Sequence, residues 1–255
     1  EAAWDEEQWT MHLAAARHTD SAYEVVWNFI AAEVRRHGAT SELAVQRKIM
    51  EHFAAHSLTT DHPPIVGVGP HSGDPHYAPD ETSNGAIREG DFVLVDLWAK
   101  LDRPRAVYSD LTRVGFVGQT VPAKYQELFA VVASARDAAI DTVRQALASG
   151  QALQGWQVDQ ACRDVIDHAG FGPHFIHRTG HNIGQETHGN GANMDNLETH
   201  EDRLVLPNTC FSIEPGIYLE EFGVRSEVNV YIDAQRGVHV TGGERQYDVV
   251  PILGR

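Results

Sequence analysis

The chain has 255 residues and carries 36 acidic against 20 basic side chains, a formal net charge of −16. This charge excludes nucleic acid and anionic membranes as favoured partners. No apolar run reaches the roughly 18 residues of a membrane span, and no secretory leader opens the sequence. We therefore expect a soluble, cytoplasmic protein. Because it begins at Glu1, we expect it to be processed or to be the catalytic part of a longer chain.

Hydrophobic periodicity and end signals predict four helices. They cover residues 40–55 and 158–168 and the longer stretches 8–37 and 122–150. Gly38 ends the first helix and Pro122 opens the third, as these residue types commonly do. Cys162 falls on the apolar stripe of the last helix, so we interpret it as a packed thiol without a redox role.

Strands are predicted where β-branched and aromatic residues cluster: at residues 65–68, 92–101 and 106–117, and in a series between 209 and 241. Residues 70–84 and 189–207 are rich in Gly, Pro, Asn, Asp and His, and such long loops often carry function. Two helices followed by strands occur twice along the chain. This order indicates an α+β fold made of two similar halves around one sheet, with residues 1–255 forming a single domain.

Four carboxylates stand in or beside apolar runs, where an unpaired charge is costly to bury. Asp96 follows Phe-Val-Leu-Val, Asp110 lies in Val-Tyr-Ser-Asp-Leu-Thr, and Glu214 and Glu227 lie in two later strand-like runs. With His181 they form the kind of oxygen-rich ligand set that hard divalent cations prefer. Four carboxylates supply a charge of about −4, which two divalent ions would neutralise and one would not.

Polar and apolar residues alternate in residues 224–232, which predicts one strand with Arg225, Glu227 and Asn229 on a single polar face. An antiparallel sheet with one solvated face would also explain this alternation without any site. It would not explain Asp96, whose neighbours in the sequence are apolar on both faces.

Several segments resemble, in order, those of the pita-bread metallopeptidases, which include methionine aminopeptidase, aminopeptidase P and prolidase. The matching segments are Gly69-Pro-His-Ser-Gly-Asp-Pro-His-Tyr, Asp96, Ser109-Asp-Leu-Thr, His177-Arg-Thr-Gly-His-Asn-Ile-Gly, His188, Ile213-Glu-Pro-Gly and Gly223-Val-Arg-Ser-Glu. The resemblance is strongest to the Xaa-Pro branch. It implies a pita-bread fold, in which two pseudo-symmetric halves place helices on a curved, mainly antiparallel sheet.

The resemblance also implies a role for each matching residue. Asp96 would bind one metal ion, and Asp110 and Glu227 would bridge this ion and a second one. His181 and Glu214 would complete the direct ligands of the second ion. Glu214 would also be the general base toward a metal-bridging hydroxide, with His76 and His188 beside the scissile bond. His177 and Arg225 would bind substrate, although Arg225 could instead balance the acidic cluster. Two departures from the family are residues 100–105, which lengthen the connection from Asp96 to Asp110, and the Gly-Asn-Gly run after His188.

The function implied is that of a metallo-exopeptidase, an Xaa-Pro aminopeptidase or dipeptidase with two divalent ions. Manganese is the expected metal, and cobalt, zinc or iron would also suit such ligands. The expected partner is a peptide substrate, and a homodimer is compatible with the sequence. Three alternatives stay open: a methionine aminopeptidase-like exopeptidase, a catalytically silent pita-bread binding module, and a metal-free creatinase-like hydrolase.

Overall fold

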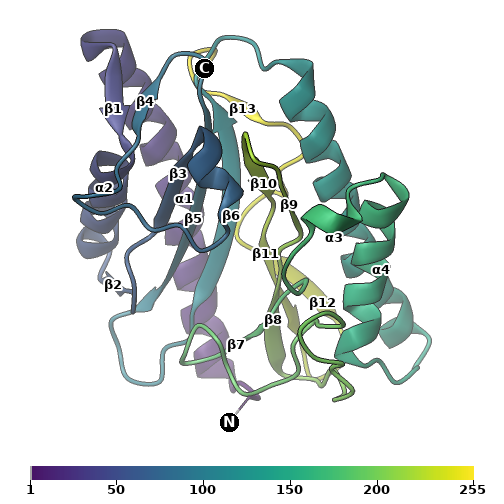
Figure 1. Ribbon diagram of the computed structural model, residues 1–255. Helices are drawn as coiled ribbons and strands as arrows, with labels where there is room; N and C mark the ends of the chain where they lie inside the picture. The colour runs from purple at the N-terminus through teal and green to yellow at the C-terminus, as the bar shows by residue number, and fades with distance from the viewer. Residues whose placement is uncertain (1) are drawn as a thin grey trace.

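Four α-helices account for most of the helical structure in the computed structural model, which describes residues 2–255 (Figure 1). They are α1 (Glu6–His37), α2 (Glu42–Ala55), α3 (Ala123–Ala148) and α4 (Gly155–His168), with short 3-10 turns at Gly69–Gly73 and Gly172–His174. Asp5 caps α1 by accepting the backbone N–H of Gln8, and Gly38 ends it at φ 80°. All four predicted helices are confirmed. Two of them begin slightly earlier than predicted: α1 at Glu6, and α4 at Gly155, a glycine that interrupts the sequence pattern.

Two sheets form the centre of the fold, and their strands are antiparallel except for β13, which pairs with β6 in parallel. The first contains β3 (Ile65–Val68), β5 (Phe92–Leu101) and β6 (Ser109–Phe116), with β2 (Leu58–Thr59) and β13 (Val250–Pro251) at its edges. The second contains β7 (Asn182–Ile183), β8 (Thr209–Ile213), β11 (Val228–Ile232) and β12 (Val238–Thr241). Two small ribbons, β1 (Ala39–Ser41) with β4 (Ala86–Arg88) and β9 (Gly216–Tyr218) with β10 (Gly223–Arg225), complete the strands.

Each half packs its own helices against its own strands. Helices α1 and α2 lie on one side of the molecule and α3 and α4 on the other, with the strands between them (Figure 1). The halves meet where β6 runs beside β11: the backbone N–H of Glu227 donates to the Thr112 carbonyl at 3.2 Å, and that of Asp110 donates to Asn229 Oδ1 at 2.9 Å. This seam brings residues more than 100 positions apart to one place.

The strand prediction for residues 224–232 is wrong in one respect. The run is divided into β10 and β11, because the N–H groups of Ser226 and Glu227 leave the ladder and donate to the Pro215 and Thr112 carbonyls. Glu214 likewise lies just beyond the end of β8. Strands β8 and β11 are buried on both faces, so a sheet with one solvated face does not explain their polar residues.

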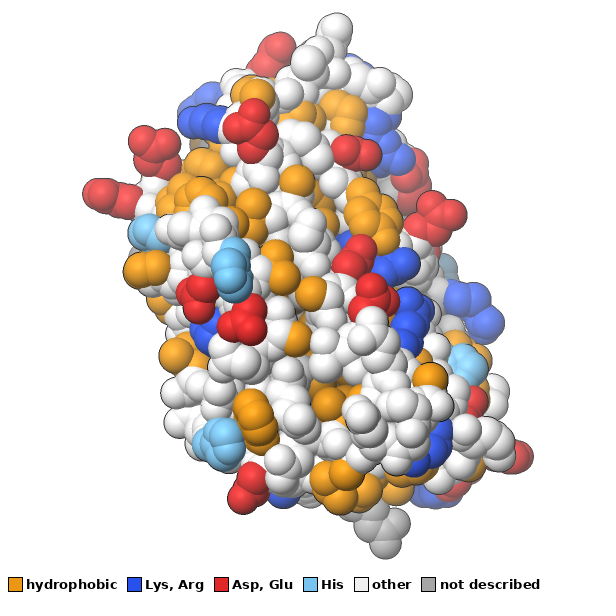
Figure 2. Space-filling view, turned by 90° about the vertical axis from the view of Figure 1, so that its right-hand side faces the viewer, with side chains coloured by type: hydrophobic (Ala, Val, Ile, Leu, Met, Phe, Trp, Pro, Cys, Tyr) orange, Lys and Arg blue, Asp and Glu red, His pale blue; other side chains and the backbone are white. Residues whose placement is uncertain are grey.

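The surface fits the acidic composition. On the face formed by α3 and α4, acidic, basic and apolar side chains are interspersed (Figure 2). Within residues 2–255, no helix is both long enough and apolar enough to cross a lipid bilayer.

Candidate metal centre

The first two carboxylates are placed by the pairing of β5 with β6. Asp96 lies opposite Thr112 and Trp98 lies opposite Asp110. Because side chains alternate along a strand, these four residues share one face of the sheet. The extra residues 100–105 extend the connection at the far end of the strands and leave this register intact.

The second half supplies the remaining donors from its strand ends. Ser212 on β8 joins two of them, because its hydroxyl accepts the backbone N–H of His181 at 2.9 Å and donates to Glu214 Oε1 at 2.9 Å. Gly180 lies so close to the Ser212 carbonyl that no Cβ would fit there. Glu227 Oε2 accepts the hydroxyl of Thr112 at 2.7 Å, across the seam between the halves.

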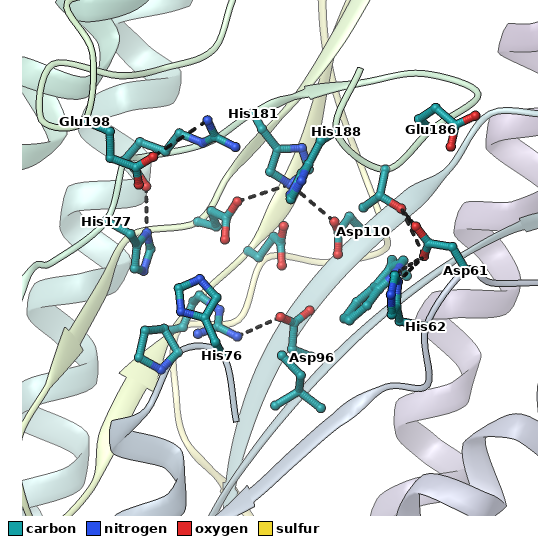
Figure 3. A pocket seen from close by; sticks show the side chains of 18 residues that line it. Asp61, His62, His76, Asp96, Asp110, His177, His181, Glu186, His188 and Glu198 are labelled. Carbon is teal, nitrogen blue, oxygen red and sulfur yellow. Dashed lines mark hydrogen bonds and ion pairs between the residues drawn. The ribbon is translucent and has the colours of Figure 1, made fainter. Parts of the chain in front are cut away.

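These side chains converge on one place (Figure 3). His181 Nε2 lies 3.5 Å from Asp110 Oδ2 and 3.3 Å from Glu214 Oε1. One ligand atom each of Asp110, His181 and Glu227 lies within 4.8 Å of the other two. The structure therefore brings four of the five predicted ligands, Asp110, His181, Glu214 and Glu227, to one cluster, and Asp96 lies beside it on β5 and lines the same cavity.

The cluster is electrostatically strained as a set of bare side chains. Burial raises the pKa of Asp110 to about 7 and also raises the pKa of Asp96. The pKa of Glu227 rises well above its ordinary value, through burial and through the charges of Asp110 and Glu214. Burial also opposes ionisation of Glu214, but the positive charges of His181 and Arg225 bring its pKa below the ordinary value.

Two acceptor atoms of the cluster lack any partner. Among the buried side chains that the structure describes, Asp96 Oδ1 and Asp110 Oδ1 receive no hydrogen bond. Buried carboxylate oxygens are rarely left unsatisfied, because the desolvation cost is then uncompensated. A cation bound between them would satisfy both, and four carboxylates with one imidazole suit Mn²⁺ and similar hard or borderline ions. The residues present thus fit a divalent metal centre.

Arg225 is tied to the cluster from the side. This guanidinium donates to Asp96 Oδ2 at 2.7 Å, to Thr112 Oγ1 at 3.1 Å and to the Tyr218 hydroxyl at 2.7 Å. Its side chain is only 3% exposed. All three guanidinium nitrogens therefore have a partner inside the protein.

A hydrogen-bond chain continues from Arg225 to the cavity wall. His177 Nδ1 donates to the Arg178 carbonyl at 2.7 Å, so its Nε2 accepts, and the Tyr218 hydroxyl supplies that bond at 2.7 Å. Burial lowers the pKa of His177 to about 4, which keeps the ring neutral. Sequence reasoning missed Tyr218, although it stands in the Gly-Ile-Tyr run directly after the matched Glu-Pro-Gly.

The other two histidines lie at the open side of the cluster. His188 packs edge-on against His181, with ring centroids 4.3 Å apart. Its pKa falls to about 4, through burial and through the charges of His181 and Arg178. His76 is exposed on the loop after β3 and lies near His177 at the lower left of Figure 3.

A cavity of about 580 Å³ opens above the cluster, and every predicted site residue lines it. Further residues that the sequence analysis did not identify also line this cavity. These further lining residues are Asp61, His62, Ile65, Pro75, Trp98, Arg178, Glu186, Thr187 and Glu198. Period-two spacing from Asp96 could have identified Trp98, and Ile65 lies on β3 directly opposite Asp96; the others lie on irregular segments without a comparable signal.

The loop that carries His76 is held by Glu42, a fully buried residue in the first turn of α2. Its carboxylate accepts the N–H groups of Val68, at 2.7 Å, and Gly85, the ring of His71 at 2.9 Å, and the hydroxyl of Tyr77 at 2.6 Å. These contacts fix both ends of the loop and the residue next to His76.

Comparison with known proteins gives consistent matches. The profile of metallopeptidase family M24 matches residues 11–234. A relative from Mycobacterium tuberculosis named "Probable dipeptidase PepE" is 33% identical over 189 residues, which cover 74% of this chain and 46% of the relative. An Xaa-Pro dipeptidase from Lactobacillus delbrueckii subsp. lactis is 29% identical over 214 residues, which cover 84% of this chain and 52% of that relative.

Solved structures show the same architecture. Dipeptidase PepE from Mycobacterium ulcerans superposes with a TM-score of 0.83 at 27% identity, covering 99% of this chain and 62% of that one. An Xaa-Pro dipeptidase from Bacillus anthracis gives 0.80 at 26% identity, covering 98% and 64%. The predicted α+β pita-bread fold is thereby confirmed. The chain spans about half the length of the curated relatives it matches.

Proposed function

The chain belongs to metallopeptidase family M24, and on that basis we propose that it is a metal-dependent exopeptidase that cleaves the N-terminal bond of Xaa-Pro peptides. The observation that carries the proposal is the convergence of Asp96, Asp110, His181, Glu214 and Glu227 beneath a cavity of about 580 Å³, with two carboxylate oxygens left without partners. A catalytically silent binding module would have no need of this cluster, because burying four carboxylates together is costly without a cation.

The metal content proposed is two divalent ions, with manganese as the first candidate. Asp96 would bind one ion, Asp110 and Glu227 would be shared, and His181 with Glu214 would bind the other. When bound, such ions polarise a substrate carbonyl and lower the pKa of a coordinated water. The raised pKa values of Asp96, Asp110 and Glu227 support this assignment, because these groups favour their charged forms only when a cation compensates them.

Glu214 is the proposed general base. Its carboxylate is ionised because its pKa is lowered, and its side chain is 16% exposed, so it reaches the cavity. The Ser212 hydroxyl donates to Oε1 of Glu214 and so holds the carboxylate in one orientation, while Oε2 takes no part in this bond. A carboxylate held in this way can accept a proton and pass it to the departing amine.

The histidines are proposed to handle substrate. A proline nitrogen lacks an N–H and must gain a proton as it leaves, so a positioned donor is needed beside it. His188 and His76 line the cavity on the open side of the cluster and suit positioning and proton relay. His177 presents a neutral ring whose orientation is held by Tyr218.

For Arg225 we propose charge balance in place of direct substrate binding. Its three partners Asp96, Thr112 and Tyr218 occupy the guanidinium, so a peptide carboxylate would have to displace one of them. Residues 1–255 are proposed to form one catalytic domain, and peptides are the proposed partners.

Metal analysis combined with a peptide panel tests the function. We expect the metal-loaded enzyme to cleave Ala-Pro or Ala-Pro-Ala and to cleave Met-Ala-Ser poorly. Preference for Ala-Pro indicates a dipeptidase, and preference for Ala-Pro-Ala an aminopeptidase. Preference for Met-Ala-Ser would contradict the Xaa-Pro assignment, and hydrolysis of none of the three by protein containing metal would contradict the peptidase assignment.

A further inference from the structure

One wall of the cavity carries a carboxylate outside the ligand cluster. Asp61 lies in the connection between β2 and β3 and lines the cavity together with Trp98 and Thr187. Asp61 and its neighbour His62 are seen at the right side of Figure 3. Its side chain is 37% exposed, unlike the buried ligands. It is not part of the matched family segments, which begin at Gly69.

Asp61 is held in place from two elements. Trp98 Nε1 donates to Asp61 Oδ1 at 2.6 Å, and the Thr187 hydroxyl lies 3.4 Å from both carboxylate oxygens. Partial burial opposes ionisation, but the Trp98 hydrogen bond and the charge of His62 keep the pKa of Asp61 below its ordinary value. The wall thus presents a fixed negative charge to the cavity.

The strand register gives the spacing between this charge and the metal ligands. Trp98 lies directly across from Asp110 and two residues along the strand from Asp96, on the same face. Asp61 therefore lies one indole ring beyond the ligand cluster. The first residue of a substrate carries both the N-terminal ammonium and the scissile carbonyl, so the ammonium would stay close to the metal ligands. Only a long side chain of that first residue would extend past Trp98 to Asp61.

Among the described basic side chains at this wall, only His62 pairs with Asp61: its Nδ1 lies 3.6 Å from Asp61 Oδ1, and the ring is charged only when protonated. Lys100, the next residue on the same strand face, donates to the Gln185 carbonyl and lies over the Tyr108 ring. Arg178 lines the same cavity near Glu198, which lies 4.0 Å away (left side of Figure 3). Glu186, another carboxylate, lines the cavity near Asp61.

We propose that Asp61 and Trp98 form the specificity subsite for the first residue of the substrate and select a basic side chain, lysine or arginine. This inference rests on the proposed exopeptidase function and names its substrate class. The aliphatic stem would lie along the indole, and the charged end would meet the carboxylate, with the ring adding a cation–π contact.

The test compares lysyl-proline with norleucyl-proline, because norleucine has a side chain of similar length but no charge. In the metal-loaded enzyme, we expect kcat/KM to favour lysyl-proline. Asp61→Asn keeps the acceptor for Trp98 and removes the charge, and should lower kcat/KM for lysyl-proline about tenfold while changing norleucyl-proline less than about twofold. The melting temperature should stay at the wild-type value.

Glu198→Gln is the matched control, because it removes one negative charge from another part of the same cavity. It should leave the ratio between the two peptides unchanged. Calorimetric binding of free lysine and norleucine, the first products, gives a readout without turnover: Asp61→Asn should weaken lysine binding only.

An equal loss on both peptides would overturn the inference, because it would assign Asp61 to the N-terminal ammonium or to structure. An unchanged ratio, or an equal change in Glu198→Gln, would overturn it as well. If the wild-type enzyme cleaves both peptides, these outcomes leave the proposed function intact. If it cleaves neither of these dipeptides and does not cleave Ala-Pro-Ala either, the proposed function fails and the inference fails with it.

Discussion

Two groups of buried carboxylates, Glu42 by itself and Asp96 together with Asp110, differ in how their oxygens are satisfied. Glu42 is 0% exposed, and its two oxygens accept hydrogen bonds from Val68, His71, Tyr77 and Gly85. Asp96 and Asp110 are buried too, yet each keeps one oxygen without a partner. Burial of a carboxylate therefore does not by itself indicate a metal ligand. A buried carboxylate oxygen that has no hydrogen-bond donor and lies next to other carboxylates does, because a cation would satisfy it.

Removing metal should have the largest effect on activity and stability, because it acts on Asp96 and Asp110 and not on Glu42. We expect a chelator to abolish peptidase activity and to lower the melting temperature, since four carboxylates then repel one another and a stabilising ligand is lost. Added manganese or cobalt should restore both. Activity assays and thermal unfolding with and without chelator measure this, and full activity in chelated, metal-free protein would contradict the metal centre.

Glu214 stands between the two groups, because one of its oxygens is satisfied by Ser212 while its side chain still reaches the cavity. Glu214→Gln keeps the shape and removes the basicity. We expect kcat to fall at least about a hundredfold, with a much smaller change in KM. Steady-state kinetics on an Xaa-Pro peptide measure it. A variant within about threefold of wild type would show that Glu214 is not the base.

Neutral substitutions in the two groups should have opposite effects on metal-free protein. Glu42→Gln places an amide NH₂ among four donors and should destabilise the fold by about 2–3 kcal/mol. Asp110→Asn removes one of several repelling charges and should raise the melting temperature. Denaturant unfolding of both variants with chelator present checks the signs. If Asp110→Asn destabilises metal-free protein as Glu42→Gln does, the two groups do not differ as described.

A pH dependence of stability is expected only in the metal-free protein. The folded-state pKa of Asp110 is about 7, well above that of an unfolded aspartate. The folded state then binds more protons than the unfolded state, so stability is greatest below the unfolded pKa and falls as pH rises from about 4 to about 7. Unfolding free energies across this range should show the decline with chelator and lose it with metal. A flat profile without metal would contradict the raised pKa.

The sequence predicted the long helices and the central strands because their periodicity and caps are local properties. It also pointed to the five candidate ligands, since four of them are carboxylates in or beside apolar runs, which are costly to bury anywhere in a fold. It did not predict the break at Ser226 and Glu227, because that break depends on the Pro215 and Thr112 carbonyls of other segments. The same reason applies to the cavity walls. Asp61 and Thr187 have no local pattern and meet only through the tertiary fold.

The seam between β6 and β11 has a consequence for the order in which this protein can mature during synthesis. Asp96 and Asp110 leave the ribosome well before Glu227, and β6 gains its parallel neighbour only when Val250 and Pro251 have emerged. A nascent chain therefore carries only Asp96 and Asp110 of the five candidate ligands until His181 has emerged, and it lacks Glu227 for longer still. Metal capture at this centre would then be a late event that follows translation of the second half, and it would report that both halves have joined.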